Sequence, residues 1–290
     1  MSIEFSPYGN IKKTLETAGF SAKKSLGQNF LYDANIIRKM ITASNVKKTD
    51  VVLEIGPGLG TITELLALNS KKVIAVEKDE KLASWLAASL KEKGIKNVEI
   101  ITGDAIIVIK DKNSGLNKIL PKKYKVVANI PYYLTSHLIR ILLESDKRPE
   151  SITLMIQKEV AERICDKNNG SLLSISVSYF ADAKIYSTVS KNCFHPRPKI
   201  DSAIISLFPK KNIPEKSFTK YFFLILKTSF SSPRKQILKN LTKIGEREKI
   251  ELILKKSGIQ NNCRAETLSL DDWIKITKNY VSSISLIEKE

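Results

Sequence analysis

Cysteine and histidine are scarce in this chain, and their scarcity limits the chemistry it can support. Cys165, Cys193 and Cys263 lie far apart, and no two of them have the spacing of metal ligands or of a disulfide framework. His137 and His195 are the two histidines, and neither has metal-ligand partners nearby in the sequence. We therefore expect reduced thiols, as in a cytoplasmic protein, and no metal site.

Long apolar runs are also missing. The densest apolar cluster, "FFLIL" at 222–226, is too short to cross a bilayer. The first 20 residues lack the apolar core of a signal peptide. These absences predict a soluble protein of the cytoplasm.

Acidic residues are few relative to basic ones. The chain carries 30 Asp and Glu against 48 Lys and Arg, a net charge of +18. An excess of this size favours a polyanionic partner, because Lys and Arg that bind phosphates release counterions. Many lysines are scattered singly, so charge that serves only solubility is the alternative. An acidic membrane is less favoured, since no basic amphipathic helix with bulky apolar anchors is present.

Strand and helix patterns alternate over the first half of the chain, which has 290 residues. The alternation predicts a parallel sheet with right-handed crossovers. The predicted strands are 51–56, 72–77, 98–104, 124–130 and 151–157, and the predicted helices are 61–68, with Thr61 as its cap, 79–94 and 136–144. Further strands are predicted at 172–180, 184–189 and 202–208.

After residue 210 the pattern changes to helical spacing alone. Four segments have it, at 218–230, 232–244, 246–258 and 270–281. We predict two domains, residues 1–209 and residues 210–290.

Three strand ends carry residues that are typical of a nucleoside pocket, because ligands of open α/β sheets bind beyond the carboxyl ends of the strands. Gly56, Gly58 and Gly60 follow the first strand and let the backbone approach a ligand. Glu77 ends the second strand, where a carboxylate can accept both ribose hydroxyls. Asp104 follows the third strand. Taken singly, these are a common glycine turn, a solvated acid beside a lysine, and a helix cap.

The ligand's charge follows from the acids around the loop. Glu54 directly precedes the glycines, whose spacing is G-x-G-x-G rather than the G-x-G-x-x-G of dinucleotide sites. A carboxylate there opposes a pyrophosphate and suits a cation. This favours S-adenosylmethionine, an adenosine with a positive sulfonium, over NAD.

The fourth strand ends in "NIPYYLTS" (129–136), which suits a site for a base amine. The side-chain oxygen of Asn129 and the carbonyl of Ile130 or Pro131 can accept from the amine, while the proline ring fixes the backbone. Tyr132 offers a flat face to an extruded base. The increase in the rate of methyl transfer would come mainly from positioning and electrostatics. An Asx turn before a helix is the alternative.

In combination, these motifs resemble the ribosomal RNA adenine dimethyltransferases, and in particular the small-subunit rRNA dimethyladenosine transferases. The similarity covers nearly the whole chain, in family order and spacing. It is carried by "KKSLGQNFLYD" (23–33), "VLEIGPGLGTIT", "VIAVEKD", "GDA", "NIPYYLTS", "LMIQKEVAERI" (154–164), "CFHPRPKIDSAIISL" (193–207) and "FSSPRKQILKNL" (230–241).

The resemblance implies a Rossmann-like class I methyltransferase domain with a small helical C-terminal domain that contacts RNA. It implies S-adenosylmethionine-dependent dimethylation of N6 on two adjacent adenosines, in the 3′-terminal hairpin loop of 16S rRNA, during biogenesis of the 30S particle. Its implied cofactor residues are Gln28, Asn29, Leu31, Gly56, Glu77, Asp104 and Asn129, and the glycine loop with the acid that precedes it adds Gly58 and Glu54. Asn129, Pro131 and Tyr132 would hold the target base, and Phe194 would stack on its other face; a core aromatic is the alternative for Phe194.

Other readings stay open at this point. A large-subunit rRNA methyltransferase of the macrolide-resistance type shares the fold and the loop, although "FHPRPKIDSA" and the Lys-rich C-terminal part fit the small-subunit enzymes better. A non-catalytic assembly factor and an NAD oxidoreductase are the others. Tyr133 departs from the family's frequent Asn, and its role is open. We expect a monomer whose partner is small-subunit rRNA or a 30S precursor particle, without a membrane.

Overall fold

The computed structural model describes residues 15, 19–23, 26–166 and 170–287. Its contacts divide the chain into two compact units. The first contains residues 1–162 and 182–209, and the second contains 163–181 and 210–290. The division therefore groups the segment 163–181 with the C-terminal part, whereas the sequence-based boundary near residue 210 left it in the first domain.

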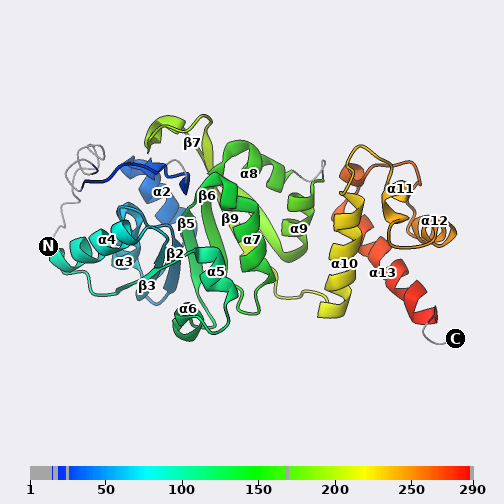
Figure 1. Ribbon diagram of the computed structural model, residues 1–290, viewed down its shortest axis with the longest axis horizontal. Helices are drawn as coiled ribbons and strands as arrows, with labels where there is room; N and C mark the ends of the chain where they lie inside the picture. Colours follow the sequence, from blue (N-terminus) through cyan, green and yellow to red (C-terminus); the bar gives the residue numbers. More distant parts are fainter. Residues whose placement is uncertain (1–14, 16–18, 24–25, 167–169, 288–290) are drawn as a thin grey trace. The chain divides into compact units, whose positions relative to one another are not determined.

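A seven-stranded sheet forms the first unit (Figure 1). The strand order is β4-β3-β2-β5-β6-β9-β7, with β9 antiparallel to β6 and the five strands from β4 to β6 parallel. The strands are β2 (Val51–Ile55), β3 (Lys72–Glu77), β4 (Val98–Thr102), β5 (Lys125–Asn129), β6 (Ser151–Gln157), β7 (Ala181–Val189) and β9 (Ser202–Pro209). This is the predicted α/β fold.

The central strands are apolar because helices cover the sheet, so both faces of a parallel strand are buried. Val52, Leu53, Val126 and Val127 are fully buried. The helix α2 packs on β5 and β6, while α5 and α7 pack against each other and lie in front of the strands in Figure 1. The helices of this unit are α2 (Ala34–Ser44), α3 (Thr61–Asn69), α4 (Glu80–Glu92), α5 (Ala105–Lys110), α6 (Gly115–Ile119) and α7 (Thr135–Glu144). The helix α8 (Lys158–Cys165) begins in this unit, and the division falls within it, after residue 162.

A second, two-stranded sheet joins the N-terminal segment to a distant part of the same unit. β1 (Phe30–Leu31) pairs antiparallel with β8 (Phe194–His195), so that Leu31 lies opposite Phe194. This pairing holds the segment that carries Gln28 and Asn29 beside the main sheet. Residues 24 and 25 of the predicted signature 23–33 lie outside the described residues.

The second unit is helical. It consists of α9 (Leu172–Phe180), α10 (Lys216–Ser229), α11 (Ile237–Leu241), α12 (Arg247–Lys256) and α13 (Leu270–Ile287). Trp273 and Phe222 are among its fully buried side chains, and Phe222 stacks on Tyr179 with ring centroids 4.1 Å apart.

Two local predictions are wrong. Residues 172–180 form the helix α9 and not a strand, because Ser171 and Ser174 make a capping box that starts a helix there. The cap of α3 is Gly60 and not Thr61, which is the first helical residue. None of the described helices is long and apolar enough to cross a membrane.

Candidate active site

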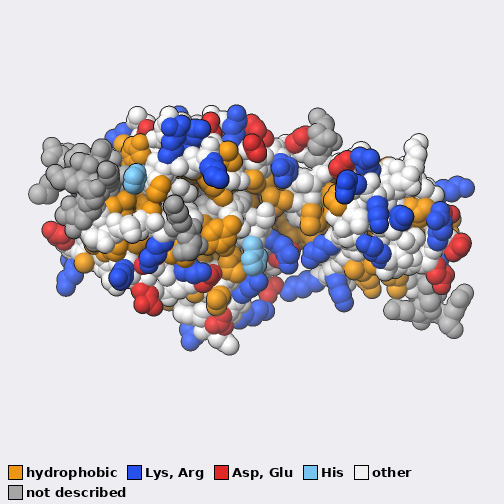
Figure 2. Space-filling view, turned by 45° about the horizontal axis from the view of Figure 1, so that its top comes forward, with side chains coloured by type: hydrophobic (Ala, Val, Ile, Leu, Met, Phe, Trp, Pro, Cys, Tyr) orange, Lys and Arg blue, Asp and Glu red, His pale blue; other side chains and the backbone are white. Residues whose placement is uncertain are grey.

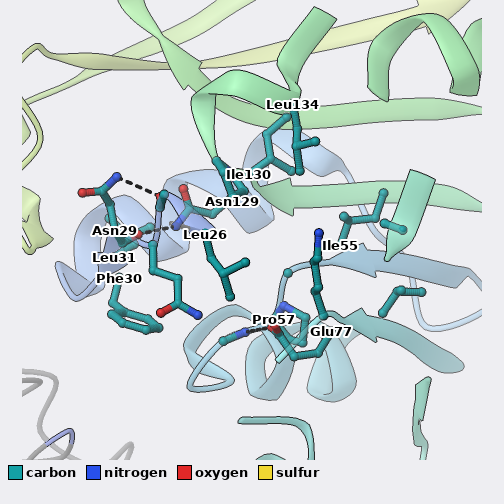
Figure 3. A pocket seen from close by; sticks show the side chains of 18 of the residues that line it. Leu26, Asn29, Phe30, Leu31, Ile55, Pro57, Glu77, Asn129, Ile130 and Leu134 are labelled. Atoms are coloured by element: carbon teal, nitrogen blue, oxygen red, sulfur yellow. Dashed lines mark hydrogen bonds between the residues drawn. The ribbon is translucent and has the colours of Figure 1, made fainter. Parts of the chain in front are cut away.

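A pocket lies at the carboxyl ends of β2, β3, β4 and β5 (Figure 3). Each of these strands contributes the residues that follow it, and the N-terminal segment 26–31 forms a further wall. Most of the predicted site residues therefore meet in one place. Those that line the pocket are Gln28, Asn29, Leu31, Gly56, Gly58, Glu77, Asp104, Asn129, Pro131 and Tyr132.

The glycine loop after β2 contains positions where any residue other than glycine would be strained. Gly58 has φ 56°, and a Cβ there would lie 3.2 Å from the Phe30 ring. Gly60 has φ 79°, and a Cβ there would collide with Leu86 of α4. The loop therefore brings bare backbone to the pocket between Phe30 and α4.

Glu77 is fixed by backbone donors at the end of β3. Its Oε2 accepts from the Gly58 N–H at 3.0 Å and its Oε1 from the Asp79 N–H at 2.9 Å. Burial raises the pKa of this carboxyl. Each oxygen keeps acceptor capacity beyond its one backbone bond, as a pair of vicinal hydroxyls requires.

Asp104 has two roles in the structure. Its Oδ1 caps α5 by accepting from the Ile106 N–H at 2.9 Å, and its Oδ2 accepts from the Lys78 ammonium at 2.8 Å. The bond from Lys78 lowers the pKa of Asp104. The helix-cap reading and the pocket reading of this acid are therefore compatible, since the side chain also lines the pocket.

Two asparagines connect the N-terminal segment to the end of β5. The side-chain amide of Asn129 donates to the Asn29 carbonyl at 3.2 Å, and the amide of Asn29 donates to the Gly27 carbonyl at 3.2 Å. Figure 3 shows both amides on one side of the pocket, away from Glu77. Because the nitrogen of Asn129 is engaged, its Oδ1 is the atom left to accept from a ligand.

Tyr132 and Tyr133 begin a short 3₁₀ turn, 132–134, after Pro131. The hydroxyls of Tyr132 and Ser202 lie 2.8 Å apart, and burial raises the pKa of Tyr132. Tyr133 is 60% exposed, and its ring lies against Gly27: a Cβ on that glycine would be 3.4 Å from Cε1 of the ring. The two neighbouring phenols thus face different partners.

Glu54 is placed differently from its prediction. It lies behind the pocket and does not line it, and it is 1% exposed, with no hydrogen-bond partner for Oε2 among the described residues. Burial raises the pKa of this carboxyl to about 8. Glu54 therefore does not face the pocket in this conformation, and its part in binding a cationic ligand stays a prediction.

Phe194 also does not line the pocket. It is 3% exposed and belongs to a core cluster that includes Leu31 and Met40. In this conformation it is the core aromatic that was the alternative reading, because its pairing with Leu31 turns the ring inward. Stacking on a base would require the ring to turn, and it stays a prediction.

Lys78, Gly27 and Tyr133 line the pocket without having been predicted as site residues. A signal was available for Lys78, which directly follows the ribose acid. The contact between Gly27 and Tyr133 spans more than a hundred residues of sequence, and no local pattern indicates it. Among the described residues, no group of three or more His, Cys, Asp or Glu side chains could hold a metal.

A model of the family "Ribosomal RNA adenine dimethylase" matches residues 19–281. This chain belongs to the ribosomal RNA adenine dimethylases. The similar relatives include proteins named ribosomal RNA small subunit methyltransferase A. One, from Lactobacillus helveticus, is 41% identical over 89% of this chain and 91% of its own length. Another, from Enterococcus faecalis, is 39% identical over 94% of this chain and 95% of its own length.

Solved structures agree with the fold. A dimethyladenosine transferase from Plasmodium falciparum has a TM-score of 0.72 and 27% identity, over 87% of this chain and 98% of its own. The 23S rRNA methyltransferase ErmE has a TM-score of 0.68 and 24% identity, over 87% of this chain and 99% of its own. The likeness to ErmE bears on the fold alone. The predicted Rossmann-like methyltransferase fold with a helical C-terminal part is confirmed.

Proposed function

We propose that this chain dimethylates N6 of two adjacent adenosines in the 3′-terminal hairpin loop of small-subunit rRNA, with S-adenosylmethionine as the methyl donor. The observation that carries the proposal is the position of Asn129, whose amide is held in the same pocket as Glu77 and Asp104. The names of the relatives, which specify the small subunit, favour this RNA over that of the large subunit.

The pocket fits the donor by the chemistry of its walls. Glu77 offers two oriented carboxylate oxygens to ribose hydroxyls, and Asp104 offers an acceptor to the adenine amine. The backbone at Gly56 and Gly58 allows close approach. Apolar residues of the same pocket, among them Ile55, Val76, Ala105 and Ile130, suit the flat base. When bound, S-adenosylmethionine supplies the electrophilic methyl group.

Asn129 would act on the acceptor amine. The lone pair of an exocyclic amine is delocalised into its ring, which makes the nitrogen a poor nucleophile. The Oδ1 of Asn129, together with the carbonyl of Ile130 or Pro131, would accept the two amine hydrogens and favour a pyramidal nitrogen. The bond from Asn129 to the Asn29 carbonyl keeps the amide from turning, so the oxygen is pre-positioned.

Pro131 and Tyr132 would hold the target base beside Asn129. Proline fixes φ, and it leaves a carbonyl that accepts from the Leu134 N–H at 3.0 Å. The contact between the hydroxyls of Tyr132 and Ser202 anchors the end of the ring, whose face would then stack on a base. After transfer, the proton of the methylated amine passes to water, so no histidine base is required.

The helical unit would bind the RNA backbone. Arg234, Lys235 and Lys239 are exposed on it, and Figure 2 shows Lys and Arg side chains spread over its helices. Cations that neutralise phosphates supply affinity that does not depend on sequence and that falls with salt. We assign residues 210–290 to this role and residues 1–209 to methyl transfer.

The test uses radiolabelled S-adenosylmethionine with purified small-subunit rRNA, small-subunit precursor particles and large-subunit rRNA. The proposal expects label only in small-subunit material. Label in large-subunit rRNA would instead make the chain an enzyme of the macrolide-resistance type. RNA binding without transfer would make it an assembly factor. A comparison of naked RNA with particles also establishes which form is the substrate.

A further inference from the structure

The second unit contains a buried asparagine that bonds to the backbone where a turn begins. Asn240 of α11 is fully buried. Its Nδ2 donates to the Ser229 carbonyl at 2.7 Å and to the Ser232 carbonyl at 3.0 Å. Ser229 is the last residue of α10, so this one amide joins the end of α10, the turn that follows and the helix α11.

The turn at residues 231–236, which we name the basic turn, also has local bonds of its own. The Ser231 N–H donates to the Thr228 carbonyl at 3.2 Å, and the Lys235 N–H donates to the Ser232 carbonyl at 2.9 Å. Lys243 donates to the Ser231 hydroxyl at 2.7 Å. The end of the turn is held by the Ile237 N–H, which donates to the Cys263 carbonyl at 2.9 Å. The two bonds from Asn240 are the side-chain bonds that tie the start of the turn to α11.

The turn presents its cations to solvent. Arg234 and Lys235 are both exposed, and neither forms an ion pair with any acid of the described residues. Elsewhere in this unit Arg247, Lys249 and Lys275 do pair with acids. Cations without acidic partners need no exchange of partners before they bind phosphate.

We propose that Asn240 is a positioning residue that holds the basic turn in the geometry in which Arg234 and Lys235 bind RNA phosphates. The inference rests on the proposed function, since it takes RNA as the substrate. A turn that is ordered before binding loses no further backbone entropy when RNA binds. The attraction between both cations and the phosphates then contributes in full to the binding free energy. Without Asn240, the entropy cost of ordering the turn offsets part of this contribution.

A double-mutant cycle separates this role from a merely structural one. The affinity for a 3′-terminal fragment of small-subunit rRNA is measured over a series of salt concentrations for wild type, Asn240→Ala, Arg234→Gln with Lys235→Gln, and the triple variant. We expect Asn240→Ala and the double cation variant each to weaken binding by roughly tenfold. The salt slope should fall by about two in the cation variant, about one for each lost phosphate contact, and should fall in the same direction for Asn240→Ala.

The triple variant decides the matter. If Asn240 acts through the two cations, adding Asn240→Ala to the cation variant weakens binding by less than about twofold, because nothing remains to be positioned. An equal tenfold loss in both backgrounds, or an unchanged salt slope in Asn240→Ala, overturns the proposal. Wild type that fails to bind or methylate the RNA would overturn the proposed function instead.

Thr277→Val is the matched control. Thr277 is also fully buried in this unit, and its hydroxyl donates within α13 to the Trp273 carbonyl at 2.8 Å. Its loss removes a buried hydrogen bond away from the turn, and RNA affinity should stay within about twofold of wild type. If Asn240→Ala does not fold, Asn240→Leu, which keeps a similar side-chain volume, removes both donations and adds no charge, takes its place in the same cycle.

Discussion

The side chain of Asn129 donates a hydrogen bond of 3.2 Å to the backbone carbonyl of Asn29, one hundred residues earlier in the chain. The bond joins the end of β5 to the N-terminal segment that walls the pocket. It also orients the amide, because Nδ2 faces the Asn29 carbonyl and Oδ1 can accept from a ligand. The orientation of the proposed catalytic group thus depends on the N-terminal segment.

Asn129→Ala should reduce turnover by roughly 100- to 1000-fold, because an oriented polar group that acts mainly in the transition state is lost. RNA affinity should change by less than about threefold, since phosphate contacts supply most of it. Single-turnover methyl transfer and equilibrium RNA binding measure the two effects. Equal losses in turnover and in affinity would refute the catalytic role.

Glu77→Gln should weaken binding of S-adenosylmethionine by about 10- to 100-fold. An amide places an NH₂ group where the carboxylate accepts from the Gly58 or Asp79 N–H, so a donor would face a donor. Titration calorimetry with S-adenosylhomocysteine avoids turnover. Glu99→Gln is the control, because Glu99 is half exposed and pairs with Lys72 outside the pocket. The affinity of this variant for S-adenosylhomocysteine should match that of wild type.

Gly27→Ala should reduce activity by more than its loss of stability accounts for. Gly27 has φ 61°, and a Cβ would lie 3.2 Å from that of Pro131. Gly94→Ala is a close control: it has φ 68° but nothing within 4 Å. Both variants should lose about 1 kcal/mol from the backbone conformation, but Gly27→Ala alone should also raise the KM for S-adenosylmethionine. Equal KM values would show that the contact with Pro131 has no part in the site.

Glu54→Gln should flatten the dependence of stability on pH. The pKa of Glu54 is about 8 in the folded chain, against 4.5 for an ordinary glutamate. Between these values the folded chain keeps a proton that the unfolded chain releases. The contribution of this group to stability is therefore fully present below pH 4.5 and is lost as the pH rises through 8.

Urea unfolding between about pH 5 and pH 8.5 measures this effect. The free energy of unfolding of wild type should fall with pH by up to about 1.4 kcal/mol per unit more steeply than that of Glu54→Gln. The exposed pair variant Glu99→Gln should keep the wild-type slope. Identical slopes for wild type and Glu54→Gln would show that the buried carboxyl is ionised in the folded chain.

Most of the sheet could be predicted from the sequence, because β2, β3, β4, β5 and β6 are apolar runs, and the first four of them end at the pocket. The helix α9 could not, since "LLSISVSYF" is apolar enough for either structure and its Ser171–Ser174 cap and its packing on Phe222 decided for a helix. Patterns in the sequence placed Glu77, Asp104 and Asn129 at strand ends.

What the sequence could not indicate is the direction of single side chains. Glu54 and Ile55 are neighbours on β2, but Ile55 lines the pocket and Glu54 is buried behind it. The inward position of Phe194 depends on its pairing with Leu31, far away in the chain. Such placements follow from register and long-range packing, which no local pattern specifies.

The most direct test of the account is the identity and position of the methylated nucleosides. Unmodified small-subunit precursor particles are incubated with the chain and S-adenosylmethionine, and the rRNA is digested and mapped by mass spectrometry. The account predicts N6,N6-dimethyladenosine at two adjacent positions in the 3′-terminal hairpin loop, and none with Asn129→Ala that still binds the RNA. Methylation at any other nucleoside, or dimethyladenosine confined to large-subunit rRNA in a parallel reaction, would contradict it.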